Sequence, residues 1–345
     1  MEKHLPATVT GFIPVLPSRF RKGNNNMNVE IWIQNGTKAY QPAICSGITL
    51  ESKRTGTPST LKFTAIQDDV LKISEGNPVR MTVDGTKMFF GFIFKIARDK
   101  TNKVQITAYD QIIYLKKNKD TYVYSNLRTD QLIKMIADDF ALNVGQLENS
   151  GHTSSRADDN KTLLDIIQNS MDDTLTSTGN MYVLYDDFGS LTLKNVENMF
   201  LNLLIDAETG QNFTYTSSIE DETYNQIKLT YDNEKTGKRE VYIARDSSTM
   251  NDWGVLQYYE SIQNPNGAKA KADALLGLYN AKTKNLKVTG AFGDLRVRAG
   301  CSVVVQLDLI DVKVQNLMMV ENVKHTFNTD FHTMDLTLRG GGFVA

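Results

Sequence analysis

The stretch Leu295–Leu338 decides the fold class. It reads LRVRAGCSVVVQL over residues 295–307 and NLMMVENVKHTFNTDFHTMDLTL over residues 316–338. Apolar and polar residues alternate through Ser302–Leu307 and again through Thr333–Leu338, which is typical of strands with one buried face. The short turn Asn328-Thr329-Asp330 joins the last two strands as a hairpin. Gly300 precedes the first strand, where glycine tolerates unusual backbone angles. The stretch predicts three consecutive strands of a barrel or strongly curved sheet.

A second β region extends from Asn28 to Asp110. Val29, Ile31 and Ile33 alternate with more polar neighbours, and strand-like runs recur up to Asp110. Asp84-Gly85 separates two of these runs, and this dipeptide is typical of a tight type I′ hairpin. Turn signals roughly every 8–12 residues favour a sandwich or barrel.

The segment between the two β regions has a mixed pattern. Apolar residues recur at helical spacing in Thr129–Ala141, with Thr129 as the expected N-cap. A second helix starts at Thr162–Asp165, which resembles a capping box. A hairpin follows across the turn Asp186-Asp187-Phe188-Gly189. This pattern predicts a small α/β domain.

The rest of the chain returns to β structure. Ile227–Tyr231 is expected to pair with Val241–Ile243 across a polar loop, and Ala268–Ala281 has the apolar stripe of a helix. We find no repeat of 20–50 residues, only a coarser succession of β, α/β and β regions. The expected domains are residues 1–27 as an arm, 28–118 and 203–345 as β domains, and 119–202 as the α/β insertion, with one helix near 267–282.

The N-terminal arm has no periodicity. It contains three prolines and the cluster Arg19-Phe20-Arg21-Lys22. A loosely ordered terminus is one interpretation. The other is an arm that lies on a neighbouring subunit, because several of its residues are too apolar for a solvated tail, namely Phe12, Ile13, Val15, Leu16 and Phe20.

Composition and charge exclude some functions. The 345 residues are 41% hydrophobic and 23% charged, which is typical of a globular chain, and the net charge is −2. This charge argues against nucleic-acid recognition by a large basic surface. No signal peptide is expected, and no window approaches the ~18 apolar residues of a membrane helix. The chain is therefore expected to be made in the cytoplasm without a membrane anchor.

Acidic pairs are the most conspicuous candidates for chemistry. They are Asp68-Asp69, Asp138-Asp139, Asp158-Asp159, Asp172-Asp173 and Asp186-Asp187. A glycosidase needs two carboxylates roughly 5–10 Å apart across a sugar. Adjacent residues point in different directions on strands and helices, so they do not supply this geometry directly. Two of the pairs are expected at helix ends and one in a hairpin turn, where acids cap helices or stabilise turns, so most of these pairs are expected to be structural.

Histidines and cysteines give no strong metal or nucleophile motif. The histidines are His4, His152, His325 and His332, without the close spacing of a zinc site. His325 and His332 flank the last hairpin turn beside Asp330, and a two-histidine site is the alternative to a plain polar hairpin. Cys45 and Cys301 are expected to be buried free thiols. No cofactor, metal or catalytic residue is assigned.

Basic residues and aromatics gather at a few places. The basic clusters are Lys116-Lys117-Asn118-Lys119, Lys235–Arg239 and Arg296-Val297-Arg298, and Tyr114, Tyr122 and Tyr124 flank the first. A single-strand nucleic-acid binder uses such a mixture. The slightly acidic total favours ordinary loop charge. An adhesin-like groove would need aromatics, but Trp32 and Trp253 fit a core or an interface equally well.

A series of motifs occurs in a fixed order along the chain: Ile106–Asp110, Tyr114-Leu115, Thr129–Ala141, Thr162–Ile167, Tyr182–Leu193 with Asp187-Phe188-Gly189, Arg298-Ala299-Gly300, His325-Thr326-Phe327 and Met334–Leu338. In this order they resemble the XkdQ/YqbQ-type tail proteins of phages and phage-like particles. These proteins are similar to the baseplate hub proteins of contractile tails and to late control protein D. The resemblance covers roughly Asn28–Arg339.

The resemblance implies a mainly β fold with an α/β insertion, in which each chain supplies two tail-tube-like β-barrels. It implies a non-enzymatic homotrimer whose ring of six barrels joins the hexameric tail tube protein to the threefold central spike protein. Tape measure and baseplate wedge proteins are further expected partners. The particle would be a phage, a prophage or an R-type bacteriocin, assembled in the host cytoplasm. Pairing between neighbours would also cover long strand edges. The alternative is a tail-associated protein that binds or cleaves cell-wall glycan.

Overall fold

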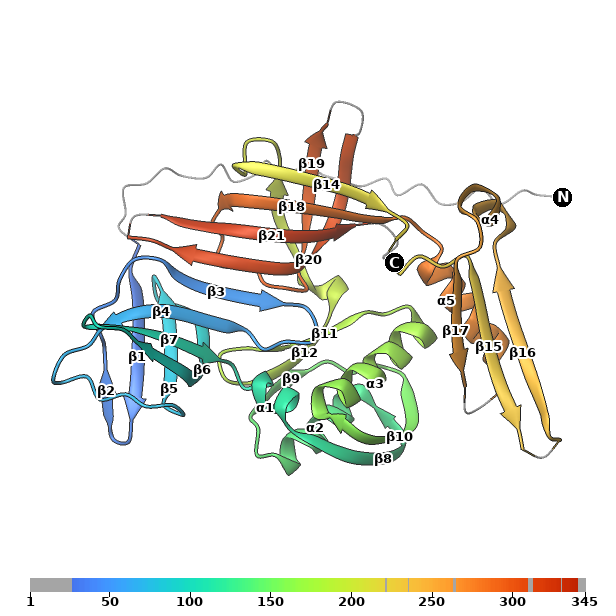
Figure 1. Cartoon of the computed structure of the whole chain (residues 1–345), viewed down its shortest axis with the longest axis horizontal. Coiled ribbons are helices and arrows are strands. Elements are labelled where there is room, and N and C mark those ends of the chain that lie inside the picture. The colour runs from blue at the N-terminus through green and yellow to red at the C-terminus, as the bar shows by residue number, and fades with distance from the viewer. Residues whose placement is uncertain are drawn as a thin grey trace.

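The computed structural model describes residues 27–220, 222–234, 236–262, 265–309, 313–329 and 331–340. Nearly all of the predicted arm, together with His4 and Asp330, lies outside these ranges. Twenty-one strands and five α-helices are assigned within them, so the predicted mainly β class with helical parts is confirmed. Figure 1 shows one group of strands at the top and one at the left, and two groups that contain both strands and helices, below and at the right.

The first β unit contains seven strands. They are β1 (Val29–Asn35), β2 (Lys38–Tyr40), β3 (Ile48–Lys53), β4 (Thr60–Ile66), β5 (Pro78–Val83), β6 (Thr86–Arg98) and β7 (Lys103–Tyr109). Asp84 and Gly85 form the two-residue loop between β5 and β6, with φ of 48° and 79°, so the predicted tight hairpin is confirmed. The core of this unit includes Ile31, Leu61, Met81 and Ile106.

The α/β part follows β7. It contains α1 (Ile112–Lys117), β8 (Lys119–Arg128), α2 (Thr129–Asp139), β9 (Val144–Leu147), β10 (Thr153–Thr162), α3 (Leu163–Thr178), β11 (Tyr182–Asp186), β12 (Leu191–Asn195) and the short 3-10 helix η1 (Val196–Met199). The Thr162 side chain caps α3 by accepting the Asp165 N–H at 3.1 Å, as predicted. Thr129 was wrongly predicted as the N-cap of α2. Arg128 holds that position, because the Thr129 hydroxyl is buried against Ser170.

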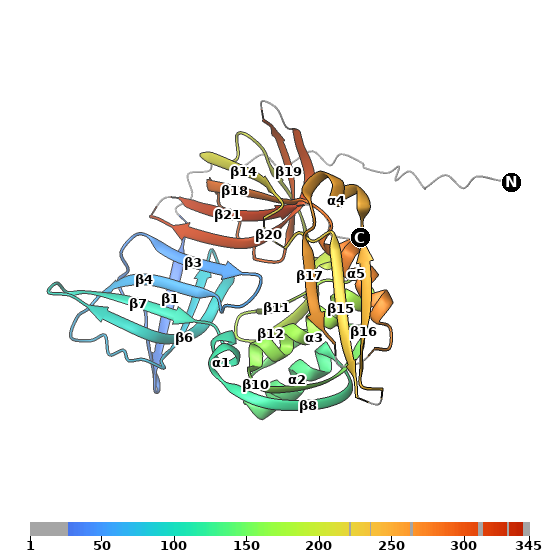
Figure 2. The ribbon, with the colours of Figure 1, turned by 45° about the vertical axis from the view of Figure 1, so that its right-hand side comes forward.

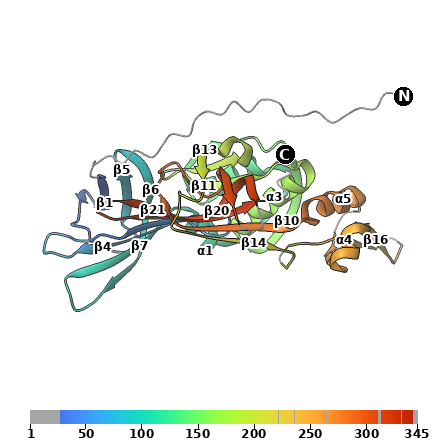
Figure 3. The same cartoon turned by 90° about the horizontal axis from the view of Figure 1, so that it is seen from above.

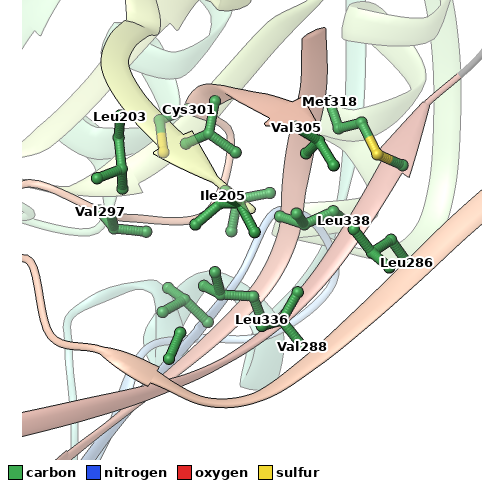
Figure 4. Packing of buried hydrophobic residues seen from close by; sticks show 14 of the residues in the cluster. Leu203, Ile205, Leu286, Val288, Val297, Cys301, Val305, Met318, Leu336 and Leu338 are labelled. Atoms are coloured by element: carbon green, nitrogen blue, oxygen red, sulfur yellow. The ribbon is translucent and has the colours of Figure 1, made fainter. Parts of the chain in front are cut away.

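The second β unit contains six strands. They are β13 (Phe200–Ile205), β14 (Asn212–Ser218), β18 (Thr283–Phe292), β19 (Ser302–Asp308), β20 (Lys313–Phe327) and β21 (His332–Gly340). The predicted strands of Leu295–Leu338 and their closing hairpin are confirmed. Figure 4 shows side chains from both ends of this region meeting in one core, including Leu203, Ile205, Val305 and Leu338.

A projecting unit lies between β14 and β18. It consists of β15 (Gln226–Asn233), β16 (Lys238–Arg245), α4 (Ser247–Trp253), β17 (Gln257–Ser261) and α5 (Ala268–Tyr279). Its three strands form a separate sheet, and Ile227 and Leu229 of that sheet share a hydrophobic core with Ala272 of α5. The sequence predicted its hairpin and helix but did not separate it from the β domain at 203–345. Figure 2 brings this unit forward at the right.

The two β units share one continuous sheet. The thirteen-stranded sheet follows the order β14-β18-β21-β20-β3-β4-β7-β6-β5-β1-β2, with β19 and β13 branching from β20. β20 of the second unit pairs directly with β3 of the first. In the described residues the strand path is open at β14 and β2, so no closed barrel is assigned. Figure 3 shows β4, β7 and β14 along one line, while β1, β5 and β6 rise from it at the left, so the sheet curls.

The two β units repeat the same strand order and register. β3-β4-β7-β6-β5 corresponds to β14-β18-β21-β20-β19. Pro78, Phe92 and Tyr109 lie side by side in the first unit, as Ser302, Met319 and Arg339 do in the second. In both units the long strand has a β-bulge directly after these positions. It lies between Ile93 and Lys95 in β6 and between Val320 and Asn322 in β20.

A glycine marks the same point in both units. The Gly76 N–H donates to the Ile93 carbonyl at 2.7 Å, and the Gly300 N–H donates to the Val320 carbonyl at 2.8 Å. Their φ values are 86° and 94°, a region that favours glycine. A Cβ at Gly300 would lie 2.8 Å from a Val183 methyl carbon, whereas a Cβ at Gly76 would meet nothing within 4 Å.

We therefore expect Gly300→Ala to destabilise the protein more than Gly76→Ala. Both variants carry roughly 1–2 kcal/mol of backbone strain. Gly300→Ala adds the contact with Val183, and such overpacking costs about 1–3 kcal/mol. Urea unfolding would measure both losses. In the Val183→Ala background, Gly300→Ala should cost less unfolding free energy than it does in the wild type, whereas the cost of Gly76→Ala should not change. Equal losses for the two glycine variants in the wild-type background would contradict this account.

Candidate assembly site: the seam between the β units

The seam consists of the paired segments Ile48–Lys53 of β3 and Asn322–Phe327 of β20. They run antiparallel from Ile48 opposite Phe327 to Lys53 opposite Asn322. Backbone bonds extend the ladder at both ends, from Gly47 N–H to the Phe327 carbonyl at 3.2 Å and from Arg54 N–H to the Glu321 carbonyl at 2.9 Å. The seam is therefore held mainly by main-chain hydrogen bonds between residues far apart in sequence.

Side chains strengthen one end of the seam. The Arg54 Nε donates to Glu321 Oε2 at 2.9 Å, and the two side chains are only 15% and 21% exposed. The Asn322 amide donates to Glu51 Oε1 at 3.2 Å. Hydrogen bonds to charged partners contribute about 1.5–3 kcal/mol, more than neutral ones. This ion pair could not be predicted from the sequence, because no local pattern connects residues 54 and 321.

A pair of histidines lies beside the seam: His325 of β20 is opposite Leu50, and His332 of β21 is opposite Phe327. His325 Nε2 lies 3.0 Å from the Val297 carbonyl, which requires Nε2 to donate. His325 Nδ1 then accepts a hydrogen bond from His332 Nε2 at 2.8 Å. Burial lowers the pKa of His325 to about 4 and that of His332 to about 3, so both rings are neutral. The structure thus brings the predicted histidine pair together, as a hydrogen-bonded pair.

The turn Asp186–Gly189 of the α/β part contacts both β units. Phe188 packs against Phe90 of β6 with ring centroids 6.0 Å apart, and Lys87 Nζ lies 5.1 Å from the Phe188 ring. From the connection between β18 and β19, Arg298 contacts Asp187 of the turn at 3.6 Å, and its guanidinium lies 4.1 Å from the ring centre of the preceding Tyr185. This turn therefore fixes the α/β part against both sides of the seam.

Two buried carboxyls hold the first β unit to the α/β part. Asp110 accepts the N–H groups of Ser59 at 2.8 Å and Ile112 at 3.0 Å. Asp186 accepts the Gln111 amide at 2.8 Å and the Gly189 N–H at 2.6 Å. Burial and the nearby Asp186 carboxyl raise the pKa of Asp110 to about 7, and burial also raises the pKa of Asp186.

Two hollows adjoin these contacts. A cavity of ≈ 70 Å³ lies where the two β units meet the α/β part, and its lining includes Asp110, Asp186 and His325. A larger groove of ≈ 590 Å³ separates α3 from the projecting unit. In this groove, Arg156 contacts Asp173 at 2.8 Å and Lys271 contacts Glu260 at 2.7 Å. Its charges therefore largely pair with one another.

The other acidic pairs predicted as caps and turns have structural partners. Asp68 accepts the Leu71 N–H at 2.7 Å, and the buried Asp158 contacts Lys161 at 2.8 Å. Asp139 accepts the Tyr122 hydroxyl at 2.7 Å, and Asp172 accepts the Gln168 amide at 2.8 Å. These acids hold turns and helices in place, in agreement with the structural interpretation.

The aromatic and basic candidates are dispersed. Tyr122 and Tyr124 are buried, and Tyr114 packs against Phe92 and Phe94. These rings do not form an exposed stacking platform. Lys116 donates to the Gly56 carbonyl at 2.8 Å, while Lys235 lies outside the described residues. Cys301 is buried and Cys45 half-buried, both as free thiols.

Searches for two further kinds of site gave negative results. Over the described ranges, no group of three or more potential metal ligands was found. No helix among the same residues is long and apolar enough to cross a membrane.

The buried carboxyls predict a pH dependence. A carboxyl whose pKa is raised on folding stabilises the protein at low pH, and this stability is lost as the pH rises through the folded pKa. Asp110 has an ordinary pKa of 3.8 when unfolded and about 7 when folded, so we expect the urea midpoint of the wild type to fall as the pH rises from about 4 to about 7 and to level off above that. Asp186→Asn removes a neighbouring negative charge, so this decline should flatten.

Asp187→Asn is the matched control, because Asp187 is the adjacent side chain and is 61% exposed. It should keep the wild-type decline with pH. The explanation fails if Asp186→Asn and Asp187→Asn have the same pH profile.

The sequence has clear relatives. A family model described as YQBQ-like matches residues 48–339. The phage-like element PBSX protein XkdQ of Bacillus subtilis (strain 168) is 31% identical over 320 residues, covering 89% of this chain and 96% of that protein. The Bacillus subtilis protein YqbQ is 30% identical over 320 residues, covering 89% of this chain and 95% of its own length.

Solved structures share the fold. A tail protein from Neisseria meningitidis MC58 matches with a TM-score of 0.67 at 12% identity, covering 92% of this chain and 98% of that one. An Escherichia coli component of the type VI secretion system, described as similar to the T4 bacteriophage tail proteins gp27 and gp5, matches with a TM-score of 0.54 at 12% identity. The match covers 89% of this chain and 76% of that one. With a family match over most of its length, the chain belongs to the YqbQ-like family of phage tail proteins.

Proposed function

We propose that the chain is the structural hub subunit of a contractile tail baseplate. In this proposal, three copies form a ring that joins the hexameric tail tube to the threefold central spike. The observation that carries it is the repeat of two β units, in the same strand order and register, within one sheet. Two units per chain and three chains give six similar units, which matches a sixfold tube on one side and a threefold spike on the other.

The seam supports this proposal because it joins the two units side by side through main-chain pairing. A repeated unit that joins its neighbour in one direction can continue into a ring when further copies join in the same way. The particle would be a phage, a prophage or an R-type bacteriocin, and the tape measure and wedge proteins would be further partners. In this role the chain would bind its partner proteins through complementary surfaces and would catalyse no reaction.

The alternative is a tail-associated protein that binds or cleaves cell-wall glycan. The groove beside α3 is the place where acids and aromatic rings come together, with Asp172, Tyr258 and Tyr279 among its lining residues. Its acids mostly contact basic groups or amides of the chain itself. We therefore favour assembly over glycan cleavage.

Light scattering across a concentration series tests the hub proposal. A trimer should have three times the 38.7 kDa mass of the chain. Because partner proteins can stabilise an assembly by mass action, the same series is repeated with purified tube and spike proteins. A chain that stays monomeric and binds neither partner would sink the hub proposal. Turnover of purified cell wall would instead support the glycan alternative.

A further inference from the structure

We propose that β14 of one copy pairs antiparallel with residues Lys95–Arg98 of β6 in the next copy. This contact would reproduce between chains the seam that β3 and β20 form within one chain. The inference rests on the proposed ring and deepens it, because it names the two strands and the register that connect neighbouring copies.

The internal repeat shows which strands of the two β units are equivalent. β3 and β14 are equivalent, because each is the strand outside β4 and β18 respectively. β6 and β20 are equivalent, because each is a long strand that pairs with β5 or β19 through its first half and with β7 or β21 beyond its bulge. Within one chain, the seam therefore joins the β3-type strand of one unit to the β6-type strand of the other.

Each unit leaves one of these edges uncovered. β20 is covered by β3 along Asn322–Phe327, but β6 beyond Ile93 pairs with β7 alone among the described strands. β3 is paired on both sides, whereas β14 pairs only with β18 in the part of the chain that the structure describes. The two uncovered edges are thus the equivalents of the two edges that form the seam.

The register of the new contact follows from the repeat. Asn322, Val323 and Lys324 of β20 correspond to Lys95, Ile96 and Ala97 of β6. Their seam partners Lys53, Ser52 and Glu51 correspond to Ser218, Ser217 and Thr216 of β14. The derived pairs are Lys95 with Ser218, Ile96 with Ser217, Ala97 with Thr216 and Arg98 with Tyr215.

The side chains suit this pairing. β14 reads NFTYTSS and has neither charge nor proline, which are the usual protections of a free edge strand. No like charges oppose one another in the derived register. The other free end of the main strand path, β2, is only three residues long and begins with Lys38, as expected for a protected edge.

The contact must form between chains. Within one chain, six strands separate β14 from β6 in the sheet order, which is roughly 34 Å along the sheet. The pairing is also heterologous, since one copy offers β14 and the next offers β6. Repeated addition therefore leads to a closed ring or an open filament.

Engineered cysteines test the pairing. The double variant Ala97→Cys/Thr216→Cys should form disulfides between copies under mild oxidation, and non-reducing gels should show cross-linked dimers and trimers. Neither single variant should cross-link at these positions, because a heterologous contact never places a residue opposite itself. The matched control Ala97→Cys/Asn212→Cys moves the second cysteine four residues along the same side of β14, about 13 Å away, and should not cross-link.

The outcomes separate this inference from the hub proposal. Trimers by light scattering that fail to cross-link in Ala97→Cys/Thr216→Cys would overturn the pairing and leave the hub intact. Cross-linking of either single variant, or equal cross-linking of the shifted control, would also overturn it. Failure of the chain to associate with itself, with tube or with spike would sink both proposals. Cross-links that stop at the trimer would support both.

Discussion

The main-chain pairing of β3 with β20 is the interaction on which the rest of the structure depends. It makes one sheet from two units by pairing two strands that lie more than 250 residues apart in sequence. The Arg54–Glu321 ion pair lies at one end of this ladder and the histidine pair lies beside it, and the turn at Asp186–Gly189 holds the α/β part against both units. Backbone hydrogen bonds specify direction and register, so the two units cannot slide past one another without losing the whole ladder.

Local features were predictable from the sequence because their causes are local. Alternation identified the strands, Asp84-Gly85 identified its hairpin, and Thr162 identified the start of α3. The missed N-cap at Arg128 has a tertiary cause, because burial of the Thr129 hydroxyl against Ser170 outweighs its capping preference. The shared sheet and the pairing of residues 54 and 321 depend on contacts between distant segments, which no local pattern records.

The internal repeat did leave a sequence signal, although a weak one. Leu61-Lys62-Phe63-Thr64-Ala65 of β4 corresponds to Leu286-Lys287-Val288-Thr289-Gly290-Ala291 of β18. Gly290, with φ of 63°, is the extra residue, and the register between β18 and β21 shifts there. Gly76 and Gly300 are a second pair of equivalent positions. Large insertions separate these motifs, so a search for repeats of 20–50 residues could not align them.

The projecting unit lies in the connection between the antiparallel strands β14 and β18, and this position affects the symmetry of any ring that the chain forms. In the first β unit, β3 passes to β4 through residues 54–59 alone, whereas the equivalent connection from β14 to β18 contains three strands and two helices. A ring built from alternating units would therefore look nearly sixfold along its shared sheet and strictly threefold at its periphery. In such a ring the same polypeptide would meet sixfold and threefold partners, because one of its two equivalent connections is short and the other holds a folded unit.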